Sequence, residues 1–168
     1  KCDSKIIRIS LKPEKITVNP EVFKVIKAAD TIFIGPGDLF TTILPNFLIK
    51  EIMDAVKESK CMKVYICNLM TRRYELDDFL VSKHIEKINE YVKGDIIDYV
   101  VANAGEIPDE VLIKYRRLKY TDVKLDEEEI KRMGVGLIKK RFLKIDENSY
   151  IRHDPYKFGK ALIKLISI

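Results

Sequence analysis

Short β-branched runs alternate with longer segments of helical periodicity along most of the chain. Strands are predicted at residues 31–34, 63–67 and 96–102, where apolar β-branched residues cluster. In the segments between and after them, apolar residues recur every three or four positions, which predicts helices at 20–28, 45–58, 80–92 and 108–118. This alternation is typical of βαβ units, so we expect an α/β fold with a mostly parallel sheet.

Weaker patterns predict the remaining elements. They are a strand at 6–11, a loop at 68–78, a minor strand at 123–125, a short helix at 127–133, a late β element around 143–151 and a final helix ending at 166. Two helix starts carry a local signal, because Asn19 and Asp154 each precede a proline and can cap the helix that follows. With 168 residues and no linker or internal repeat, we expect residues 1–168 to form a single α/β domain.

Charge narrows the class of partner. The formal net charge is +5, but basic and acidic residues are interleaved, and only Arg72–Arg73, Arg116–Arg117 and 139–141 form basic clusters. None of these clusters alternates with aromatic residues as in single-strand nucleic-acid binders, so we expect an anionic small ligand rather than nucleic acid.

The cysteines and the ends of the chain suggest its setting. Cys2, Cys61 and Cys67 are odd in number and lack CxxC spacing, which argues against disulfides and a zinc site, and Cys61 and Cys67 are predicted to be buried thiols. No apolar run approaches the length of a membrane helix, so a cytoplasmic protein is expected. The chain begins at Lys1 without methionine and runs at once into a strand-like segment, which suggests a fragment of a longer protein.

The segment IFIGPGDLFTTILPN, residues 32–46, carries the strongest chemical signal. A buried strand runs into Gly35 and Gly37, then into the hydroxyls of Thr41 and Thr42, and a helix begins near Pro45. Such a turn beside a helix N-terminus favours anions. Contact with a phosphate or ribose and a purely structural tight turn are both open interpretations.

A second signal follows the strand at 63–67. Asn68 and Thr71 lie at its carboxyl end, where open parallel sheets bind ligands. Asn68 could read a base or sugar edge, or could bridge neighbouring strand ends.

Tyr115 and Arg152 form a weaker third candidate, since tyrosine can stack on a base and arginine suits phosphate recognition. His84 lies beside the apolar stripe of its helix and is predicted to be a hydrogen-bonded, partly buried histidine. With two histidines and no acid cluster, no catalytic metal site is predicted.

These motifs in this order resemble one protein family. AADTIFIGPGDLFTTILPNFLI, VYICNLMT, His84, the VLIKY helix, MGVG and the terminal RHDP are similar to the YvcK-type gluconeogenesis factors, which share a fold with the CofD-type 2-phospho-L-lactate transferases. The resemblance implies a Rossmann-like, three-layer α/β/α fold. It also implies binding of UDP-sugars such as UDP-N-acetylglucosamine and a role in gluconeogenic growth, cell shape and cell-wall metabolism.

The resemblance also assigns site residues by motif position. Asn68, Met70 and Thr71 match the NLMT motif, while Tyr115 and Arg152 match the tyrosine and arginine of the nucleotide-sugar readers. The segment GPGSLYTSI-PN is matched by Gly35, Gly37, Leu39, Thr41, Pro45 and Asn46.

Several departures affect the ligand. Asp38 and Phe40 stand where serine and tyrosine are usual, and the stretch MTQPGET reads MTRRYEL at residues 70–76, without its Pro-Gly turn. Arg72 and Arg73 could supply charge to phosphates or could be solvated. The glycine-rich GGGTG and DDGGSSG segments of the family's N-terminal half are absent from these residues.

The leading hypothesis is a nucleotide-sugar-binding regulatory protein, the C-terminal part of a longer CofD-like domain, with no cofactor beyond a UDP-sugar or other nucleotide ligand. Its ligand site would combine Gly35, Gly37, Leu39, Thr41, Thr42, Asn46, Asn68, Thr71, Tyr115 and Arg152. The alternatives are a CofD-type transferase and a degenerate site that serves as an interaction module. A second copy of the chain and the N-terminal half are the expected protein partners.

Overall fold

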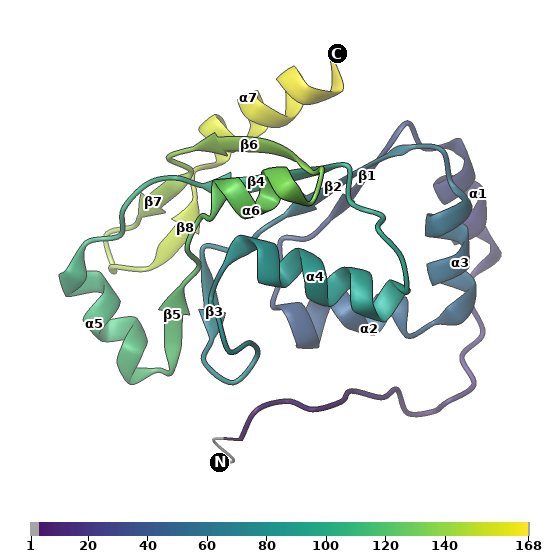
Figure 1. The fold of residues 1–168 in the computed structure, drawn as a ribbon, viewed down its shortest axis with the longest axis horizontal. Coiled ribbons are helices and arrows are strands. Elements are labelled where there is room, and N and C mark those ends of the chain that lie inside the picture. Colours follow the sequence, from purple (N-terminus) through teal and green to yellow (C-terminus); the bar gives the residue numbers. More distant parts are fainter. Residues whose placement is uncertain (1–3, 168) are drawn as a thin grey trace.

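The computed structural model describes residues 4–167, and its centre is a parallel four-stranded sheet in the order β1-β2-β4-β6 (Figure 1). Its strands are β1 (Thr31–Ile34), β2 (Met62–Ile66), β4 (Tyr99–Asn103) and β6 (Gly136–Lys140). The register pairs Thr31 with Met62, and Tyr99 with both Val64 and Gly136. The mostly parallel sheet predicted from the sequence is confirmed.

Helices cover both faces of this sheet. One face packs against α7 (Pro155–Ile166) through a cluster that includes Val64, Val101 and Leu165. The other face carries the main core, to which α4 (Val81–Val92) contributes Ile85 and Ile88, both fully buried. The short helices α2 (Leu44–Phe47), α3 (Lys50–Glu58) and α6 (Glu127–Arg132) complete that layer. The arrangement is a Rossmann-like α/β fold.

Two helices begin where local capping predicts. Asn19 accepts a hydrogen bond from the amide of Glu21 at 3.0 Å, directly before α1 (Pro20–Ala28). Asp154 caps α7 in the same way, accepting from the amides of Tyr156 and Lys157 at 3.1 Å. A proline at the first helical position fixes the backbone and lacks an N–H that would be unpaired there, which explains both starts.

The helix predicted at 45–58 is divided. A π-helical turn, η1 (Leu39–Ile43), comes first and runs into α2, and α3 begins only at Lys50. The interruption lies at Ile49, whose backbone is extended with φ −84° and ψ 102°. Apolar periodicity continues through this residue, which is why the pattern alone did not reveal the break.

Three predictions about strands were wrong. Residues 6–11 form no strand, and the Ile6 amide donates a hydrogen bond to the Tyr74 carbonyl at 3.0 Å. The expected loop at 68–78 contains β3 (Met70–Arg72), which pairs antiparallel with β5 (Tyr120–Asp122). The minor strand therefore precedes its predicted position at 123–125.

The edge strand β6 was not predicted, whereas the late β element is confirmed as a hairpin. Strands β7 (Leu143–Ile145) and β8 (Ile151–His153) pair antiparallel, and Lys144 lies opposite Arg152. With β3, β5 and α5 (Asp109–Arg117), the hairpin forms one end of the molecule, while α1 and α3 lie at the other (Figure 1).

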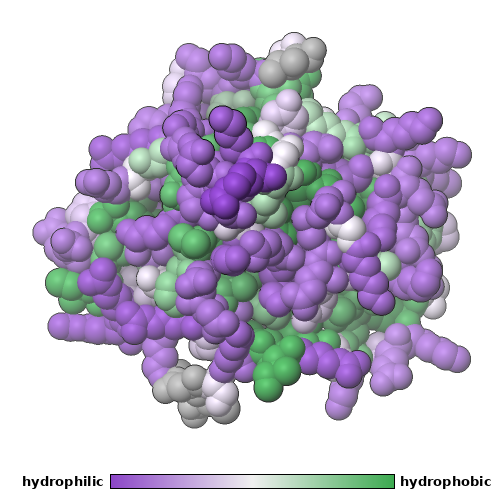
Figure 2. Space-filling view, viewed as in Figure 1, coloured by the Kyte–Doolittle hydropathy of each residue, from purple (hydrophilic) through white to green (hydrophobic). Residues whose placement is uncertain are grey.

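That end has an apolar cluster of its own, built from Leu69, Met70, Val111, Leu112, Leu143 and Ile151. In the view of Figure 1, the surface of the molecule is covered mainly by hydrophilic side chains, with smaller hydrophobic areas between them (Figure 2). Within residues 4–167, no helix is both long and apolar enough to cross a membrane.

Candidate functional site

The first part of the site is the turn that ends β1. Gly35 has φ +97°, and a Cβ there would lie 2.8 Å from the carbonyl oxygen of Ile66, so the position requires glycine. At Gly37 a Cβ would lie 2.6 Å from the methyl group of Thr42. The turn therefore crosses closely over the carboxyl end of β2 and packs on the segment that follows it.

That segment uses several polar groups internally. The amides of Thr42 and Ile43 donate to the Asp38 carbonyl at 2.9 and 3.1 Å. The Asn46 side chain donates to the carbonyls of Thr42 and Ile43 at 2.7 and 3.2 Å. Leu39 is buried in the core, whereas Thr41 and Thr42 are exposed. Among the ligand contacts predicted in this segment, Thr41 and Thr42 therefore present their side chains to solvent, whereas the Asn46 side-chain nitrogen is used within the segment.

Asp38 joins this turn to the end of β2. Its carboxylate lies 3.3 Å from Nε of Arg72 and 3.5 Å from the side-chain nitrogen of Asn68. Asn68 therefore bridges strand ends, as one of its two interpretations stated. Arg72 also stacks over the ring of Tyr120, with 4.7 Å between the guanidinium carbon and the ring centre. Arg72 is held by protein groups rather than simply solvated.

The turn after β3 forms without the Pro-Gly pair of the MTQPGET stretch. The Glu75 amide donates to the Arg72 carbonyl at 3.0 Å, which closes a four-residue turn with Arg73 and Tyr74 at its centre. Neither central residue has a positive φ, so the turn does not depend on glycine.

Glu75 is a buried carboxyl beneath this turn. It accepts a hydrogen bond from the Thr71 hydroxyl at 2.9 Å, and its second oxygen, Oε1, is buried without a hydrogen-bond partner. Burial raises the pKa of Glu75, and the Thr71 hydrogen bond opposes that shift. Sequence analysis missed Glu75, although it occupies the glutamate position of the MTQPGET stretch. Thr71 itself is buried, and its hydroxyl supports Glu75.

The β7–β8 hairpin places Tyr115 against the backbone of Ile151, the residue before Arg152. The Tyr115 hydroxyl accepts a hydrogen bond from the Ile151 amide at 2.8 Å. The neighbouring Arg152 is exposed, and its guanidinium lies 5.7 Å from the ring centre of Tyr150. The side-chain nitrogen of Lys114 lies 4.1 Å from the centre of the same Tyr150 ring. The outer face of the hairpin is therefore basic and aromatic.

The hairpin is anchored to the carboxyl ends of two sheet strands. Asn103, at the end of β4, accepts hydrogen bonds from the amides of Phe142 and Leu143 at 2.9 and 3.2 Å. Burial lowers the pKa of His153, and a hydrogen bond to the backbone of Cys67 opposes that shift. Arg152 thus adjoins a residue that contacts the end of β2, close in sequence to Asn68. Asn103 was not singled out from the sequence.

Other predicted groups lie in the core. His84 makes the predicted hydrogen bond, with Nδ1 2.9 Å from the Leu80 carbonyl, and is fully rather than partly buried. Cys61 and Cys67 are buried free thiols, also as predicted, and burial raises the pKa of Cys67 to about 12. Cys2 lies outside the described residues. Within those residues, no group of three or more His, Cys, Asp or Glu side chains could hold a metal ion.

A cavity of about 870 Å³ lies at the carboxyl end of β4. It is lined by Asn103 and by charged side chains of both signs, among them Asp109, Asp122, Arg116 and Arg141. None of the predicted site residues lines it.

Comparison with known proteins agrees with the fold and the motifs. The family model described as 2-phospho-L-lactate transferase CofD matches residues 1–143. The gluconeogenesis factor of Bacillus subtilis is 38% identical over 162 residues, which cover 96% of this chain and 51% of that protein. A putative gluconeogenesis factor of Clostridium acetobutylicum is 36% identical over 164 residues, 98% of this chain and 36% of that protein.

A solved structure gives the same picture. The crystal structure of a UPF0052 family protein from Bacillus halodurans superposes with a TM-score of 0.87 at 36% identity, covering 95% of this chain and 51% of that chain. The chain thus spans about half the length, or less, of these relatives.

Proposed function

Because the chain belongs to the CofD family and its relatives include gluconeogenesis factors, we propose that it contributes to a nucleotide-sugar site with a regulatory role. The ligand is UDP-N-acetylglucosamine or a similar nucleotide sugar. The regulatory role concerns gluconeogenic growth, cell shape and cell-wall metabolism.

The observation that carries this proposal is the anchoring of the β7–β8 hairpin. Tyr115 holds the Ile151 amide, and Asn103, at the end of β4, holds the amides of Phe142 and Leu143. This geometry supports a continuous site in which Arg152 and the Gly35–Asp38 turn act on one ligand at the carboxyl end of the sheet.

Each part of the site has a separate role in this proposal. The turn at Gly35 and Gly37 and the hydroxyls of Thr41 and Thr42 bind the phosphates. Asn68 contacts the sugar or base. Arg152 pairs with the diphosphate, since a guanidinium forms two parallel hydrogen bonds to phosphate oxygens.

Calorimetric titration of the chain with UDP-N-acetylglucosamine tests the proposal. We expect saturable binding that falls at least about tenfold in Arg152→Ala, because a charge-assisted hydrogen bond contributes roughly 1.5–3 kcal/mol. Lys160→Ala is the matched control, since Lys160 is an exposed cation on α7. Equal affinity in the folded Arg152→Ala variant and the control would remove Arg152 from the site. If neither this chain nor a protein of the same length as its relatives binds the nucleotide sugar, the proposal is overturned.

A transferase is the second candidate, and the family model matched by residues 1–143 favours it. Such an enzyme would transfer a phospholactate group from a nucleotide-activated donor to a deazaflavin. An assay with those two substrates separates the candidates, because a regulatory protein binds the nucleotide sugar without forming product. Failure of both the titration and the assay would favour the third reading, an interaction module.

A further inference from the structure

A groove of about 380 Å³ lies between the turn after β3 and the C-terminal end of α5. Its lining consists of Arg73, Tyr74, Arg116, Arg117 and Lys119. Arg73 and the basic residues of 116–119, more than 40 positions apart in the sequence, thus supply one concave surface. In the part of the chain that the structure describes, no acidic side chain lines it.

Backbone hydrogen bonds hold the groove together. The Arg73 amide donates to the Lys119 carbonyl at 3.0 Å, and the Lys119 amide donates to the Arg116 carbonyl at 3.0 Å. Lys119 has φ +65°, so the chain turns sharply between α5 and β5. The arginines of the groove therefore lie on backbone segments that are hydrogen-bonded to each other.

The groove is separate from the strand-end site. Arg72 is directed to Asp38 and Tyr120, whereas the next residue, Arg73, lines the groove with α5. Tyr74 lies between the two, because its ring lines the groove and is 5.8 Å from the Arg72 guanidinium. Among the ten predicted ligand-binding residues, none lines the groove.

From this geometry we propose that the groove binds a compact oligophosphate, meaning two or more linked phosphates. Three arginines on one concave surface supply several guanidinium N–H donors, and guanidinium groups match phosphate oxygens in charge and planar geometry. The volume falls in the range of small-ligand sites, and only one aromatic ring is present. A nucleic acid would instead require an extended basic track with several stacking rings.

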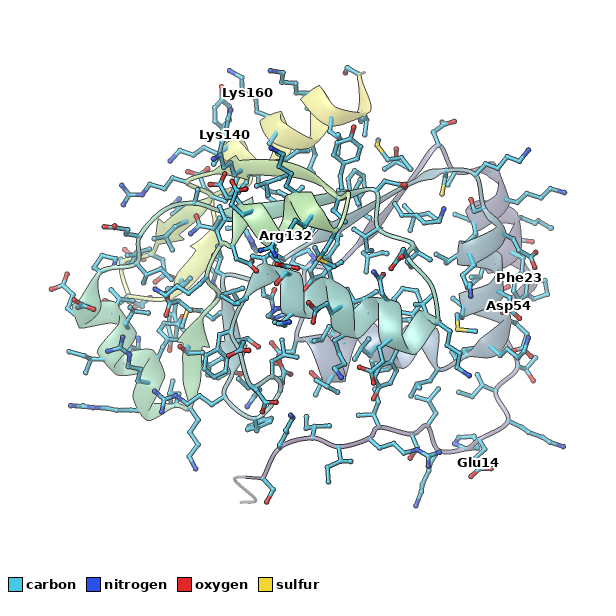
Figure 3. The ribbon with its side chains drawn as sticks, viewed as in Figure 1. Glu14, Phe23, Asp54, Arg132, Lys140 and Lys160 are labelled. Carbon is cyan, nitrogen blue, oxygen red and sulfur yellow. The ribbon has the colours of Figure 1, made fainter. Side chains whose placement is uncertain are left out.

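The test is calorimetric titration of the chain with inorganic tripolyphosphate, ATP and AMP at low and moderate salt. We expect tripolyphosphate and ATP to bind more tightly than AMP, with affinity that falls as salt rises. Arg73→Gln combined with Arg117→Gln should weaken tripolyphosphate binding at least about tenfold. The matched control is Lys131→Gln with Lys160→Gln, which removes the same charge; Lys160 lies on α7, far from α5 (Figure 3).

Two results would overturn the proposal. One is equal loss of affinity in the control pair, which would mean that only net charge matters. The other is an affinity for single-stranded oligonucleotides that rises with length and exceeds that for tripolyphosphate, which would make the surface part of a nucleic-acid track.

A competition experiment keeps this test independent of the nucleotide-sugar site. We expect UDP-N-acetylglucosamine to bind the Arg73/Arg117 variant as it binds the wild type, and not to displace tripolyphosphate. Full mutual displacement would place both ligands at the strand ends and reject a separate groove site. If the wild type binds tripolyphosphate but not UDP-N-acetylglucosamine, the nucleotide-sugar proposal fails and the groove proposal stands.

Discussion

The hydroxyl oxygen of Tyr115 on α5 lies 2.8 Å from the backbone nitrogen of Ile151 on β8 and accepts its hydrogen bond. One side chain thereby ties the helix to the strand that carries Arg152. The ring of Tyr115 also meets Tyr120 edge to face, with 6.3 Å between ring centres. The tyrosine predicted as a ligand contact is therefore also a structural tie.

Substituting Tyr115 separates these two roles. Tyr115→Phe removes the acceptor for a half-buried amide, and we expect a loss of about 1–2 kcal/mol in the free energy of unfolding. Tyr115→Ala also removes the ring and should cost about 2–4 kcal/mol. Urea denaturation measures both. If the ring stacks on a nucleotide, Tyr115→Phe retains the affinity for UDP-N-acetylglucosamine and Tyr115→Ala loses it; equal affinities in both folded variants would exclude a stacking role.

Asp38 is the residue that departs from the serine usual in this family. Replacing it with serine removes a negative charge near the proposed phosphates and releases Arg72 and Asn68. We therefore expect Asp38→Ser to raise nucleotide-sugar affinity about fivefold, roughly 1 kcal/mol, which is the Coulomb energy of two unit charges about 4 Å apart when water screens them fully. Asp54→Ser, on α3, is the control for a generic loss of negative charge. Unchanged or weaker binding in Asp38→Ser would show that the carboxylate does not oppose the ligand.

Gly35 and Gly159 provide a matched pair for backbone strain. At Gly35 an added Cβ meets the Ile66 carbonyl and φ is +97°, so Gly35→Ala should destabilise the fold by about 2–3 kcal/mol. At Gly159, inside α7, nothing lies within 4 Å of the added carbon, and alanine should stabilise the helix by about 0.5–1 kcal/mol. Thermal or urea denaturation distinguishes the two. Unchanged or increased stability in Gly35→Ala would contradict the strained turn.

Glu75 should make stability depend on pH. Burial raises its pKa from the ordinary glutamate value of 4.5, so the folded state retains the proton to higher pH than the unfolded state does. Its contribution to stability is therefore fully present below about pH 4.5 and is lost as the pH rises through the raised pKa.

Glu75→Gln is the corresponding test, because glutamine cannot ionise yet still accepts the Thr71 hydrogen bond. The free energy of unfolding of the variant minus that of the wild type should increase as the pH rises from about 4.5 and level off above the raised pKa. Urea denaturation from pH 4 to pH 8 gives this difference. A difference that is flat with pH would mean that Glu75 titrates normally.

Local sequence signals predicted those parts of the fold that depend on neighbouring residues. The starts of α1 and α7 follow from Asn19–Pro20 and Asp154–Pro155, and β1 ends at the predicted glycines. The family was also identified from motifs that remain in order along the chain. Strand β6 was missed because GLIKK has little apolar content, and its strand conformation comes from pairing with β4.

At the site, too, sequence analysis missed the contacts between residues that are far apart in the sequence. The glycine turn and Asn68 were found because each directly follows a strand. The pairing of Arg72 with Asp38 spans 34 positions, and the link from Tyr115 to Ile151 spans 36. No local pattern encodes these separations. The ligand contacts themselves remain predictions.

The contact of Asp38 with Arg72 has a consequence for how the site responds to ligand concentration. Although the two residues are 34 positions apart in the sequence, the fold holds the Asp38 carboxylate 3.3 Å from Nε of Arg72, so this carboxylate competes with a ligand phosphate for the same cation. An incoming phosphate must exceed that built-in competitor before it gains Arg72. Under the proposed function, Asp38 therefore raises the ligand concentration at which a phosphate can pair with Arg72.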